Sequence, residues 1–514
     1  MELYLGIDAS TQGVKCVVID LRSGKISAES SVNFGTDLPQ YNSPNGFLPH
    51  PDALVRHADP MMWVDGLELA LERLCSTGVD MAEIKGISGT GQQHGSVYLA
   101  DEFPVYTDDT PLSSQLKPIL SRPTSPIWMD RSTNAVCREL DERFGDLLIE
   151  RTGSPAVERF TGPQIRKFFL TEPEAYRRTR RIHLVSSFMA SVLCGKDAPI
   201  DYGDGAGMNL LDLHTLQWHK EIAEFTAPGL PEKLPSPVSG THIAGGLAAY
   251  FAKFGMTPGT PVAVWSGDNP GSLVGIGCFA PGVAGISLGT SDTLFAPMQK
   301  FHTDPEHCGH VFGNPAGGFM SLICFSNGSL AREKIREKHH LDWEFFDETS
   351  LKESVPGNNG KLMLPYFEAE STPPVLEPKV VCNYETATAA EEVRAILESQ
   401  MLSMRLHSLW LGEEIRTLRL TGGGSRSAAI RQIAADVFGA EVETIQVTNS
   451  AGLGSAMRAA NAVAGVPLEE LAKTFCAGTP AASPRREYTA LYEKQLQRYR
   501  ELEQAERRLN LNTN

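Results

Sequence analysis

The chain begins with two apolar runs that flank a short polar turn. Residues 4–8 and 14–20 are mostly apolar, and the segment STQG lies between them at 10–13. Two such runs around a glycine-containing turn predict a β-hairpin. The segment GISLGTSDTLF at 285–295 repeats the pattern 279 positions later. One similar hairpin in each half predicts a duplicated domain, because self-similarity at a fixed spacing marks repeated structural units.

Further along, short apolar runs alternate with helical patterns, which is typical of α/β domains. Asn269 and Pro270 predict the start of a helix, with Asn269 as its cap and Pro270 at its first position. Gly439 predicts the end of another helix at Phe438. The expected strands cover 84–88, 96–99, 262–266 and 418–421, and a polar terminal helix is expected over 488–509.

The domain boundary is expected in a small, flexible stretch. After the proline-rich segment LPSPV come the residues SGTHIAGG, which end at Gly246. A boundary there gives an N-terminal domain over 1–243 and a C-terminal domain over 244–514. The length of 514 residues predicts roughly three domains of about 150 residues, or two large ones. The repeat favours two similar halves with a cleft between them.

Composition and charge limit the partners of the protein. Apolar residues make up 41% of the chain and the net charge is −16, so we expect a folded protein that avoids nucleic acid and membrane surfaces. No apolar run approaches the roughly 20 residues of a membrane span, and the acidic first segment does not match a signal peptide. Nine scattered cysteines without a C-x-x-C pair predict a reducing, cytoplasmic location. The oligomeric state stays open, with a homodimer as one option.

The first hairpin carries groups suited to phosphate binding. Its turn contains Thr11, Gln12 and Gly13, and the backbone N–H groups of a tight turn can hold phosphate oxygens. Asp8, at the end of the first strand, is placed to hold Mg²⁺ directly or through water. Lys15 adds a positive charge or is simply a surface lysine. Taken by itself, the segment is equally compatible with an ordinary polar turn.

The second hairpin favours the phosphate interpretation. Gly289, Thr290 and Ser291 repeat the small hydroxyl turn, so the two hairpins could hold a nucleoside triphosphate from both halves. The same segment spells G-x-S-x-G around Ser287, the pattern of a serine hydrolase nucleophile. That pattern requires a helix after the serine, whereas residues 292–296 predict a returning strand. We therefore reject Ser287 as a nucleophile.

Two further loops follow predicted strands. Asp268 lies where a strand ends and a helix begins, a position at which α/β proteins often bind ligands. Its carboxylate could accept a proton from an attacking alcohol, and helix capping is the alternative role. The glycines Gly422, Gly423 and Gly424 leave room for a ligand to approach the backbone, although one glycine-rich loop is a weak signal.

A glycine-framed loop carries two amides and an imidazole. Gln93 and His94 in the segment GQQHG offer donors and acceptors that suit a sugar or polyol. A buried histidine with satisfied hydrogen bonds is an equal alternative. His307, Cys308 and His310 stand close together in sequence, but no second ligand pair has a familiar metal spacing. Packing is therefore favoured over metal binding for these three residues.

Together these segments resemble the FGGY family of carbohydrate kinases, within the actin-like ATPase superfamily. The similarity covers nearly the whole chain and is most specific in SGDNPGSLVG and SLGTSDTLF. The other segments that share it are GTGQQHGSVYL, WMDRSTNAVCREL, ERFTGPQIRK, DYGDGAGMNLLDL and LTGGGSRS. The fold that this resemblance implies is α/β, with two duplicated actin-like (ribonuclease H-like) ATPase domains and an inter-domain cleft.

The resemblance also implies roles for individual residues. Asp268 would be the general base that deprotonates the sugar hydroxyl, and Trp343 would lie against the adenine. Ser427 stands where members of the animal type have an asparagine. The residues that would contact the sugar are Gln93, His94, Arg159, Asp268 and Asn269. Those that would contact the nucleotide are Thr11, Gln12, Lys15, Gly289, Thr290, Ser291, Trp343, Gly422, Gly423, Gly424 and Ser427, with Asp8 at the metal.

The implied reaction is phosphoryl transfer. The family members most similar to these segments phosphorylate D-xylulose at its C5 hydroxyl, so the resemblance implies ATP, Mg²⁺ and D-xylulose as ligands. We expect closure of the two halves to exclude water, which would otherwise attack the γ-phosphorus. Other pentuloses, hexuloses or polyols remain alternative substrates. An actin-like chaperone or filament ATPase is the alternative from a different class.

Overall fold

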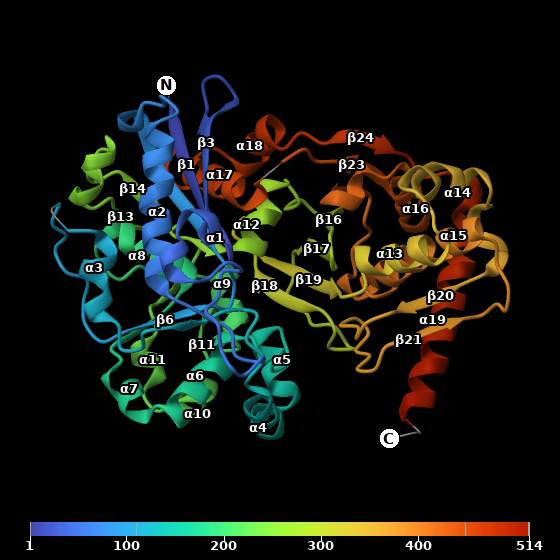
Figure 1. Ribbon diagram of the computed structural model, residues 1–514, viewed down its shortest axis with the longest axis horizontal. Coiled ribbons are helices and arrows are strands. Elements are labelled where there is room, and N and C mark those ends of the chain that lie inside the picture. The colour runs from blue at the N-terminus through green and yellow to red at the C-terminus, as the bar shows by residue number, and fades with distance from the viewer. Residues whose placement is uncertain (1, 109, 448, 512–514) are drawn as a thin grey trace.

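The computed structural model describes residues 2–108, 110–447 and 449–511 (Figure 1). Two α/β halves lie side by side, with the N-terminal half in blue and green and the C-terminal half in yellow to red. Each half is built around a seven-stranded mixed sheet. This arrangement confirms the predicted α/β fold with two similar domains.

The sheet of the N-terminal domain has the strand order β13-β14-β5-β1-β2-β3, and β15 also pairs with β5. β1 and β2 form the first predicted hairpin, in which Gly6 lies opposite Val17. β5 runs parallel to β1, with Ser88 opposite Gly6. The strands are β1 (Leu3–Ala9), β2 (Gly13–Asp20), β3 (Lys25–Asn33), β5 (Ile84–Gly91), β13 (Ile243–Gly246), β14 (Pro261–Ala263) and β15 (Ser266–Gly267).

The sheet of the C-terminal domain repeats this topology in the order β18-β19-β17-β16-β22-β23-β24. β16 and β17 form the second predicted hairpin, with Gly285 opposite Phe295, and β22 runs parallel to β16 as β5 does to β1. The pairing pattern therefore carries the duplication that the sequence repeat predicts. The strands are β16 (Val283–Leu288), β17 (Asp292–Met298), β18 (His310–Gly313), β19 (Phe319–Phe325), β22 (Thr417–Thr421), β23 (Glu441–Thr444) and β24 (Thr479–Ala482).

Helices cover both sheets. Those packed against the first sheet are α2 (Pro60–Cys75), α8 (Val185–Cys194), α12 (Asp268–Gly275) and α17 (Ser450–Ala464). The main helices of the C-terminal domain are α13 (Ser329–Lys338), α15 (Ala389–Leu406), α16 (Ala428–Phe438) and α19 (Thr489–Leu511). A helical block with its own apolar core lies below the first sheet in Figure 1 and contains α4 (Asn134–Phe144), α5 (Asp146–Thr152), α6 (Thr161–Thr171), α7 (Pro173–Arg178), α10 (Lys220–Thr226) and α11 (Leu230–Lys233).

Short elements complete the chain. The remaining helices are α1 (Phe34–Asp37), α3 (Leu112–Leu116), α9 (Tyr202–Gly205), α14 (Ser350–Lys352) and α18 (Leu468–Phe475). The remaining strands are β4 (His57–Ala58), β6 (Ser96–Leu99), β7 (Ser125–Pro126), β8 (Arg181–Leu184), β9 (Ile200–Asp201), β10 (Leu211–Asp212), β11 (Gln217–Trp218), β12 (Pro237–Val238), β20 (Met363–Tyr366) and β21 (Lys379–Cys382). They form small two-stranded sheets around the two large ones.

Helix α17 returns from the C-terminal half to the first sheet. It shares an apolar cluster with Tyr4, Val17 and Ile19 of the first hairpin. It also meets α12 at backbone distance, because a Cβ built on Gly275 would lie 1.8 Å from the carbonyl oxygen of Ser450. Only glycine permits this approach. The crossing of α12 and α17 therefore joins segments from the two halves of the chain.

The terminal helix α19 confirms the expected polar helix and buries one side of it. Tyr492 and Tyr499 are fully buried, and α19 packs against α15 and α16. The Tyr492 hydroxyl donates a hydrogen bond of 2.9 Å to Glu398. α19 is thus an integral part of the C-terminal domain. No helix in the described part of the chain is both long and apolar enough to cross a membrane.

The first domain extends past the expected boundary. β13, β14 and β15 all follow residue 242 in the chain, yet they belong to the first sheet. The glycine-rich stretch that suggested a flexible linker forms the edge strand β13, because its backbone groups pair with β14. The boundary expected between 243 and 244 is therefore misplaced, and the second sheet begins only at β16.

The segment before α12 also differs from expectation. The strand expected over 262–266 is divided into β14 and β15. α12 begins at Asp268, Gly267 is its N-cap, and no side chain caps it. Asn269 and Pro270 are consequently the second and third residues of the helix rather than its cap and first residue. The earlier start places the Asp268 carboxylate in the first turn of the helix.

Candidate active site

Two adjoining cavities lie beside the first hairpin. The smaller, of about 260 Å³, is lined by both candidate carboxylates, Asp8 and Asp268. The larger, of about 720 Å³, borders the turn of the hairpin, and both cavities include Ser10 and Lys15 in their walls. Other residues around them are Thr11, Gln12, Gly13, Phe47, Trp128, Asn269, Ser272, Asn449, Ser450 and Ala451. The structure therefore brings Asp8, Asp268 and the first hairpin together.

The Asp268 carboxyl group is electrostatically prepared to accept a proton. Burial raises its pKa to about 7, and the nearby negative charge of Asp8 adds to the increase. The backbone N–H of Asn269 donates to its Oδ1 at 2.9 Å, which partly offsets the shift. A base with a pKa near 7 is half unprotonated at neutral pH and still has a high proton affinity. Asp268 can thus deprotonate an alcohol placed in the smaller cavity.

Asp8 sits beside Asp268 at the end of β1. The Thr90 hydroxyl donates to Asp8 Oδ1 at 3.0 Å, and burial raises the Asp8 pKa to about 6. Lys15 is the cation that opposes this shift. One buried and one half-buried carboxyl group beside a single exposed lysine leave a local excess of negative charge. Mg²⁺ usually binds one or two carboxylates together with phosphates and water, so Asp8 fits a magnesium ion.

His94 is a neutral imidazole with one ring nitrogen committed. Its Nδ1 lies 2.9 Å from the Gly207 carbonyl oxygen, to which it can only donate. Burial holds its pKa well below the usual range, with Arg159 adding to the effect. Its ring stacks on Phe160 with centroids 4.3 Å apart. Nε2 is left as an acceptor, with no partner among the described residues. One of the two ring nitrogens is therefore satisfied within the protein, and the sugar contact of His94 stays a prediction.

Gln93 and Asn269 form a paired set of amides from different elements. The Asn269 Nδ2 donates to the Gln93 Oε1 at 2.8 Å and also lies 3.2 Å from Asp268 Oδ1. This orients the Gln93 amide, whose Nε2 is buried without a partner in the described structure. Buried donors are nearly always hydrogen-bonded in folded proteins. The unpaired Nε2 is therefore a candidate to bind a ligand oxygen.

Arg159 extends the same cluster toward solvent. Its guanidinium carbon lies 5.7 Å from the centroid of Phe160, the ring on which His94 stacks. It makes no hydrogen bond or ion pair with any described residue. Burial is the largest influence on its pKa and lowers it, and the nearby charge of Glu158 only partly opposes this shift. Five unpaired N–H donors beside His94 suit the hydroxyl groups of a sugar.

The C-terminal domain reaches this cluster through His310. Strand β18 carries His310, whose ring lies 5.4 Å from that of Phe160 and whose Nδ1 lies 3.1 Å from the Ser154 hydroxyl. The Val311 N–H donates to the Gly153 carbonyl at 2.9 Å. His310 therefore has a packing role between the domains. No group of three or more metal-type ligands occurs among residues 2–108, 110–447 and 449–511.

The second hairpin and the glycine loop lie against each other. Thr290 and Ser291 are exposed at the turn. A Cβ built on Gly422, which has φ 79°, would lie 2.4 Å from the carbonyl oxygen of Leu288 at the end of β16. Gly423 has open space around its α-carbon. The segment 422–424 and the turn of the second hairpin are thus neighbours, as a shared nucleotide site requires.

Two of the residues predicted to contact the nucleotide, Ser427 and Trp343, take no part in these contacts. The Ser427 hydroxyl accepts the Ile430 N–H at 3.2 Å and so serves as the N-cap of α16. Trp343 is 47% exposed, with the Arg336 guanidinium 5.0 Å from its ring. Much of the indole is therefore accessible for stacking, and its contact with adenine remains a prediction.

Sequence reasoning missed several groups around the cavities. The Trp128 indole N–H donates to the Thr11 hydroxyl at 2.8 Å, across 117 residues of chain. The Thr90 bond to Asp8 spans 82 residues. Asp204 is buried with one unpartnered oxygen, and a Cβ on Gly267 would approach that oxygen within 2.9 Å. Trp128 and Asp204 stand in the segments WMDRS and DYGDG, and Thr90 stands in GTGQQHG, but nothing in these local patterns indicates such distant contacts.

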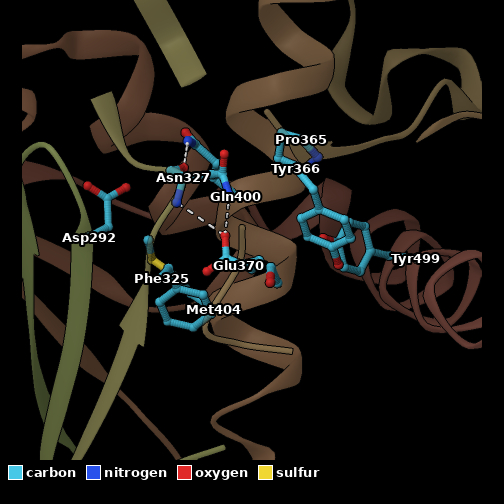
Figure 2. Close-up of a pocket in the computed structure, with 10 residues that line it drawn as sticks. Asp292, Phe325, Asn327, Pro365, Tyr366, Glu370, Gln400, Met404 and Tyr499 are labelled. Atoms are coloured by element: carbon cyan, nitrogen blue, oxygen red, sulfur yellow. Dashed lines mark hydrogen bonds between the residues drawn. The ribbon is translucent and has the colours of Figure 1, made fainter. Parts of the chain in front are cut away.

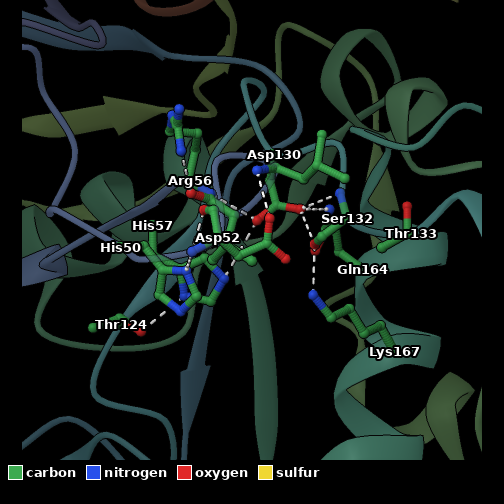
Figure 3. A network of polar contacts seen from close by, with 12 residues as sticks. His50, Asp52, Arg56, His57, Thr124, Asp130, Ser132, Thr133, Gln164 and Lys167 are labelled. Atoms are coloured by element: carbon green, nitrogen blue, oxygen red, sulfur yellow. Dashed lines mark hydrogen bonds and ion pairs between the residues drawn. The ribbon is translucent and has the colours of Figure 1, made fainter.

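A buried carboxylate holds the loop that carries Trp128 (Figure 3). Asp130 is fully buried and accepts hydrogen bonds from the Arg56 N–H at 2.9 Å, the Ser132 N–H at 3.0 Å and the Gln164 amide at 2.9 Å. Lys167 reaches the network through a 2.5 Å bond to the Ser132 hydroxyl. The network ties three chain segments together two residues after Trp128, which fixes the indole next to the first hairpin.

A duplicated α/β fold with a hydroxyl-rich hairpin in each half and two carboxyl groups at one cavity is typical of the actin-like class of ATPases. Comparison with known protein families agrees with this class. Residues 3–275 match the N-terminal domain of the FGGY family of carbohydrate kinases, and residues 284–463 match its C-terminal domain. The chain therefore belongs to the FGGY family and is an ATP-dependent carbohydrate kinase. The expected family and enzyme class are confirmed.

Individual relatives extend the comparison. The chain is 41% identical to xylulose kinase of Rattus norvegicus, with 97% of this chain and 96% of the relative covered. It is 40% identical to xylulose kinase 2 of Arabidopsis thaliana, with 89% and 87% covered. The solved structure of xylulose kinase from Rhodospirillum rubrum has a TM-score of 0.82 at 19% identity, over 97% of this chain and 98% of that one. That structure supports the fold.

Proposed function

We propose that the protein transfers the γ-phosphate of ATP to the C5 hydroxyl of D-xylulose, giving D-xylulose 5-phosphate and ADP. The observation that carries the choice of sugar is the 41% identity, over 97% of the chain, to a xylulose kinase. The chemistry near the cavity supports it, because an unpaired donor, Gln93 Nε2, and an unpaired acceptor, Asp204 Oδ1, lie against Gly267, next to a carboxyl group with a pKa near 7.

The sugar end of the site is assembled from the N-terminal domain. The Arg159 guanidinium and the Gln93 Nε2 donate to ketose oxygens, and the His94 Nε2 accepts a hydrogen bond from a hydroxyl. Asn269 holds Gln93 in this orientation through its 2.8 Å bond. A site built on such directional bonds rejects a sugar that lacks a matching hydroxyl, because its polar groups then stay buried and unpaired.

The reaction takes place between Asp268 and the hairpins. An Asp268 oxygen takes the proton of the C5 hydroxyl as the bond from O5 to the γ-phosphorus forms. The bond from phosphorus to the β,γ-bridging oxygen breaks, and ADP leaves. N–H groups of the two hairpins and Lys15 bind the phosphate oxygens and stabilise the charge that they carry. Closure of the domains excludes water from the nucleophile's position.

Asp8 would hold the magnesium ion that accompanies ATP, directly or through water. When bound, Mg²⁺ neutralises phosphate charge. Neutralisation of the phosphate charge matters more here than in a basic protein, because the chain has a net charge of −16. Local groups, rather than the overall charge, therefore make the binding of a polyanion favourable.

A coupled assay of ADP release over ketoses, polyols and aldonates tests the proposed function. We expect D-xylulose to give the highest kcat/KM, with other pentuloses and hexuloses at least tenfold lower, since one unmatched polar contact is worth about that much. Mass spectrometry and NMR of the product should place the phosphate on C5. A clear preference for another sugar, or no sugar-dependent ADP release, would overturn the proposal.

The pH profile should report the Asp268 carboxyl group. Its pKa is raised to about 7 and the unprotonated form is the active one, so kcat/KM for the sugar should be level above pH 7 and fall below it. Protonation of Asp8, with a pKa of about 6, should make the decrease in kcat/KM steeper below pH 6. The measurement is kcat/KM from pH 5 to 8.5. A profile that is level down to pH 5 would contradict the assignment.

Loss of Arg159 should affect the sugar rather than the nucleotide. We expect Arg159→Ala to raise the KM for D-xylulose by about 10–100-fold, because several charge-assisted hydrogen bonds are lost, with the KM for ATP within about twofold. Arg151→Ala is the matched control, since Arg151 pairs with Asp212 at 3.5 Å and is 40% exposed. Equal effects of the two variants on the sugar KM would argue against a sugar contact at Arg159.

A further inference from the structure

A buried ion pair lies directly beneath the second hairpin. Asp292, the first residue of β17, follows the turn 289–291 and is 1% exposed. Arg332 of α13 binds it in a forked geometry, with Nη1 2.8 Å from Oδ2 and Nη2 3.2 Å from Oδ1. Both side chains are almost fully excluded from solvent. Such a pair is weak support for stability, because the desolvation of both charges opposes their attraction.

The pair is connected to the turn by backbone hydrogen bonds. The Gly289 N–H donates to Asp292 Oδ1 at 3.1 Å. The Gly289 carbonyl accepts the N–H of Ser329, the first residue of α13, at 2.8 Å. Gly289 is therefore bound on one side to the carboxylate and on the other to the start of the helix that carries Arg332. The exposed Thr290 and Ser291 side chains make no comparable contact among the residues described.

A second set of contacts fixes the chain that enters α13 (Figure 2). The Gln400 amide donates to the carbonyl oxygens of Asn327 at 2.7 Å and Gly328 at 3.1 Å, and it accepts a bond from Arg332 at 3.0 Å. The Glu370 carboxylate accepts the Asn327 N–H at 3.1 Å and its side-chain amide at 2.9 Å. The ion pair is thus the link between this fixed segment and the turn.

Glycine is needed at position 328, where the segment that enters α13 meets the turn of the second hairpin. A Cβ on Gly328 would lie 2.7 Å from the Thr290 carbonyl oxygen and 2.8 Å from Asp292 Oδ1. No other residue could bring the two backbones so close without displacement. The turn, the carboxylate and the helix start are therefore packed as one unit.

We propose that Asp292 and Arg332 are positioning residues for the nucleotide. Through Gly289 they set the direction of the N–H groups that the second hairpin presents to the phosphates of ATP. The proposal rests on the proposed function in one respect, the binding of phosphate by this hairpin. Neither side chain touches the nucleotide, since both are buried behind the turn.

The test compares Asp292→Asn with a control that breaks another buried pair. Asp292→Asn retains an acceptor for the Gly289 N–H but leaves Arg332 without its counter-charge. The control is Glu398→Gln, which breaks the pair of Arg394 and Glu398 in α15, 3.1 Å apart and 2% and 0% exposed. ADP affinity is measured by calorimetry without sugar, and Tm is measured for each variant.

We expect both variants to lower Tm, but only Asp292→Asn to weaken ADP binding, by about tenfold or more, with the KM for D-xylulose within about twofold. The double variant Asp292→Asn/Arg332→Gln removes both charges and should recover most of the ADP affinity. Wild-type ADP affinity in folded Asp292→Asn, or equal loss in Glu398→Gln, would overturn the proposal.

A third variant covers the case in which Asp292→Asn does not fold. Arg332→Lys keeps the charge but loses the fork, so ADP affinity should fall by about 3–10-fold, and unchanged affinity would overturn the proposal. The proposed function is judged separately, on the wild type. A wild-type protein that binds ADP but phosphorylates no ketose would overturn only the proposed function, because the ADP measurement involves no sugar.

Discussion

Replacement of Asp268 by asparagine should lower kcat by about 10²–10⁴-fold, the usual contribution of a positioned general base. Asparagine keeps the size of the side chain and can still accept the 2.9 Å bond from the Asn269 N–H, so the first turn of α12 should be preserved. ADP affinity should stay within about twofold, because the proposed phosphate contacts come from the hairpins and not from Asp268. Steady-state kinetics with D-xylulose and ADP calorimetry provide the two measurements.

Asp212→Asn is the matched control for this variant. Asp212 is a buried carboxylate that, like Asp268, accepts a backbone N–H, that of His214 at 2.8 Å, but it lines neither cavity. Its kcat should remain within about twofold of the wild type. The residual activity of Asp268→Asn should also lose the inflection near pH 7. A kcat close to that of the wild type in Asp268→Asn would remove Asp268 from the role of base.

The stability of the same variant gives an independent check on the electrostatics. The pKa of Asp268 is raised in the folded state to about 7, above an unfolded value of about 3.9. The folded state therefore binds the proton more tightly, so stability falls as the pH rises from about 4 to about 7, and at pH 8 the folded state bears the full cost of the ionised carboxylate. Asparagine removes that buried charge, so Tm at pH 8 should be at least as high as in the wild type. A large drop would mean that the carboxylate has a structural role.

Patterns within single segments account for what could be predicted of the fold. Both hairpins are visible in sequence, because each is two apolar runs around a local turn. The position of the boundary was not visible, because the pairing of Ile243–Gly246 with β14 depends on a sheet whose first strand lies more than 230 residues earlier. The early start of α12 at Asp268 was equally hidden, because Gly267 provides no side-chain cap to recognise.

For the candidate site, too, local sequence patterns predicted some features and long-range contacts determined the others. Asp8, His94 and Asp268 stand in recognisable segments, since each motif offers its chemistry locally. The groups that set their properties come from elsewhere in the chain: Thr90 binds Asp8 across 82 residues, and Gly207 binds His94 across 113. The Asp268 pKa depends on burial and on Asp8, which are properties of the assembled fold. Sequence thus indicated the candidate groups of the site but not the contacts that set their properties.

The crossing of α12 and α17 should tolerate no added side-chain atom. A Cβ on Gly275 would lie 1.8 Å from the Ser450 carbonyl oxygen, and one on Gly454 would lie 2.1 Å from that of Gly271. Both obstacles are backbone atoms, so no side-chain rotation can relieve the overlap. α12 carries Asp268 at its start, and Ser450, at the start of α17, lines the smaller cavity. Separation of the helices would therefore displace Asp268, the proposed base, relative to the rest of the cavity.

We expect Gly275→Ala to lower Tm by about 5–10 °C and kcat by more than tenfold, because overpacking against backbone costs about 3 kcal/mol or more. Gly423→Ala serves as the control for stability alone, since Gly423 has no atom within 4 Å of the added Cβ, and its Tm should change by no more than about 2 °C. Calorimetry and steady-state kinetics measure both quantities. Wild-type Tm and kcat in Gly275→Ala would contradict this prediction. The two helices would then be able to move apart without disturbing Asp268, and their close crossing would not be what holds Asp268 in place.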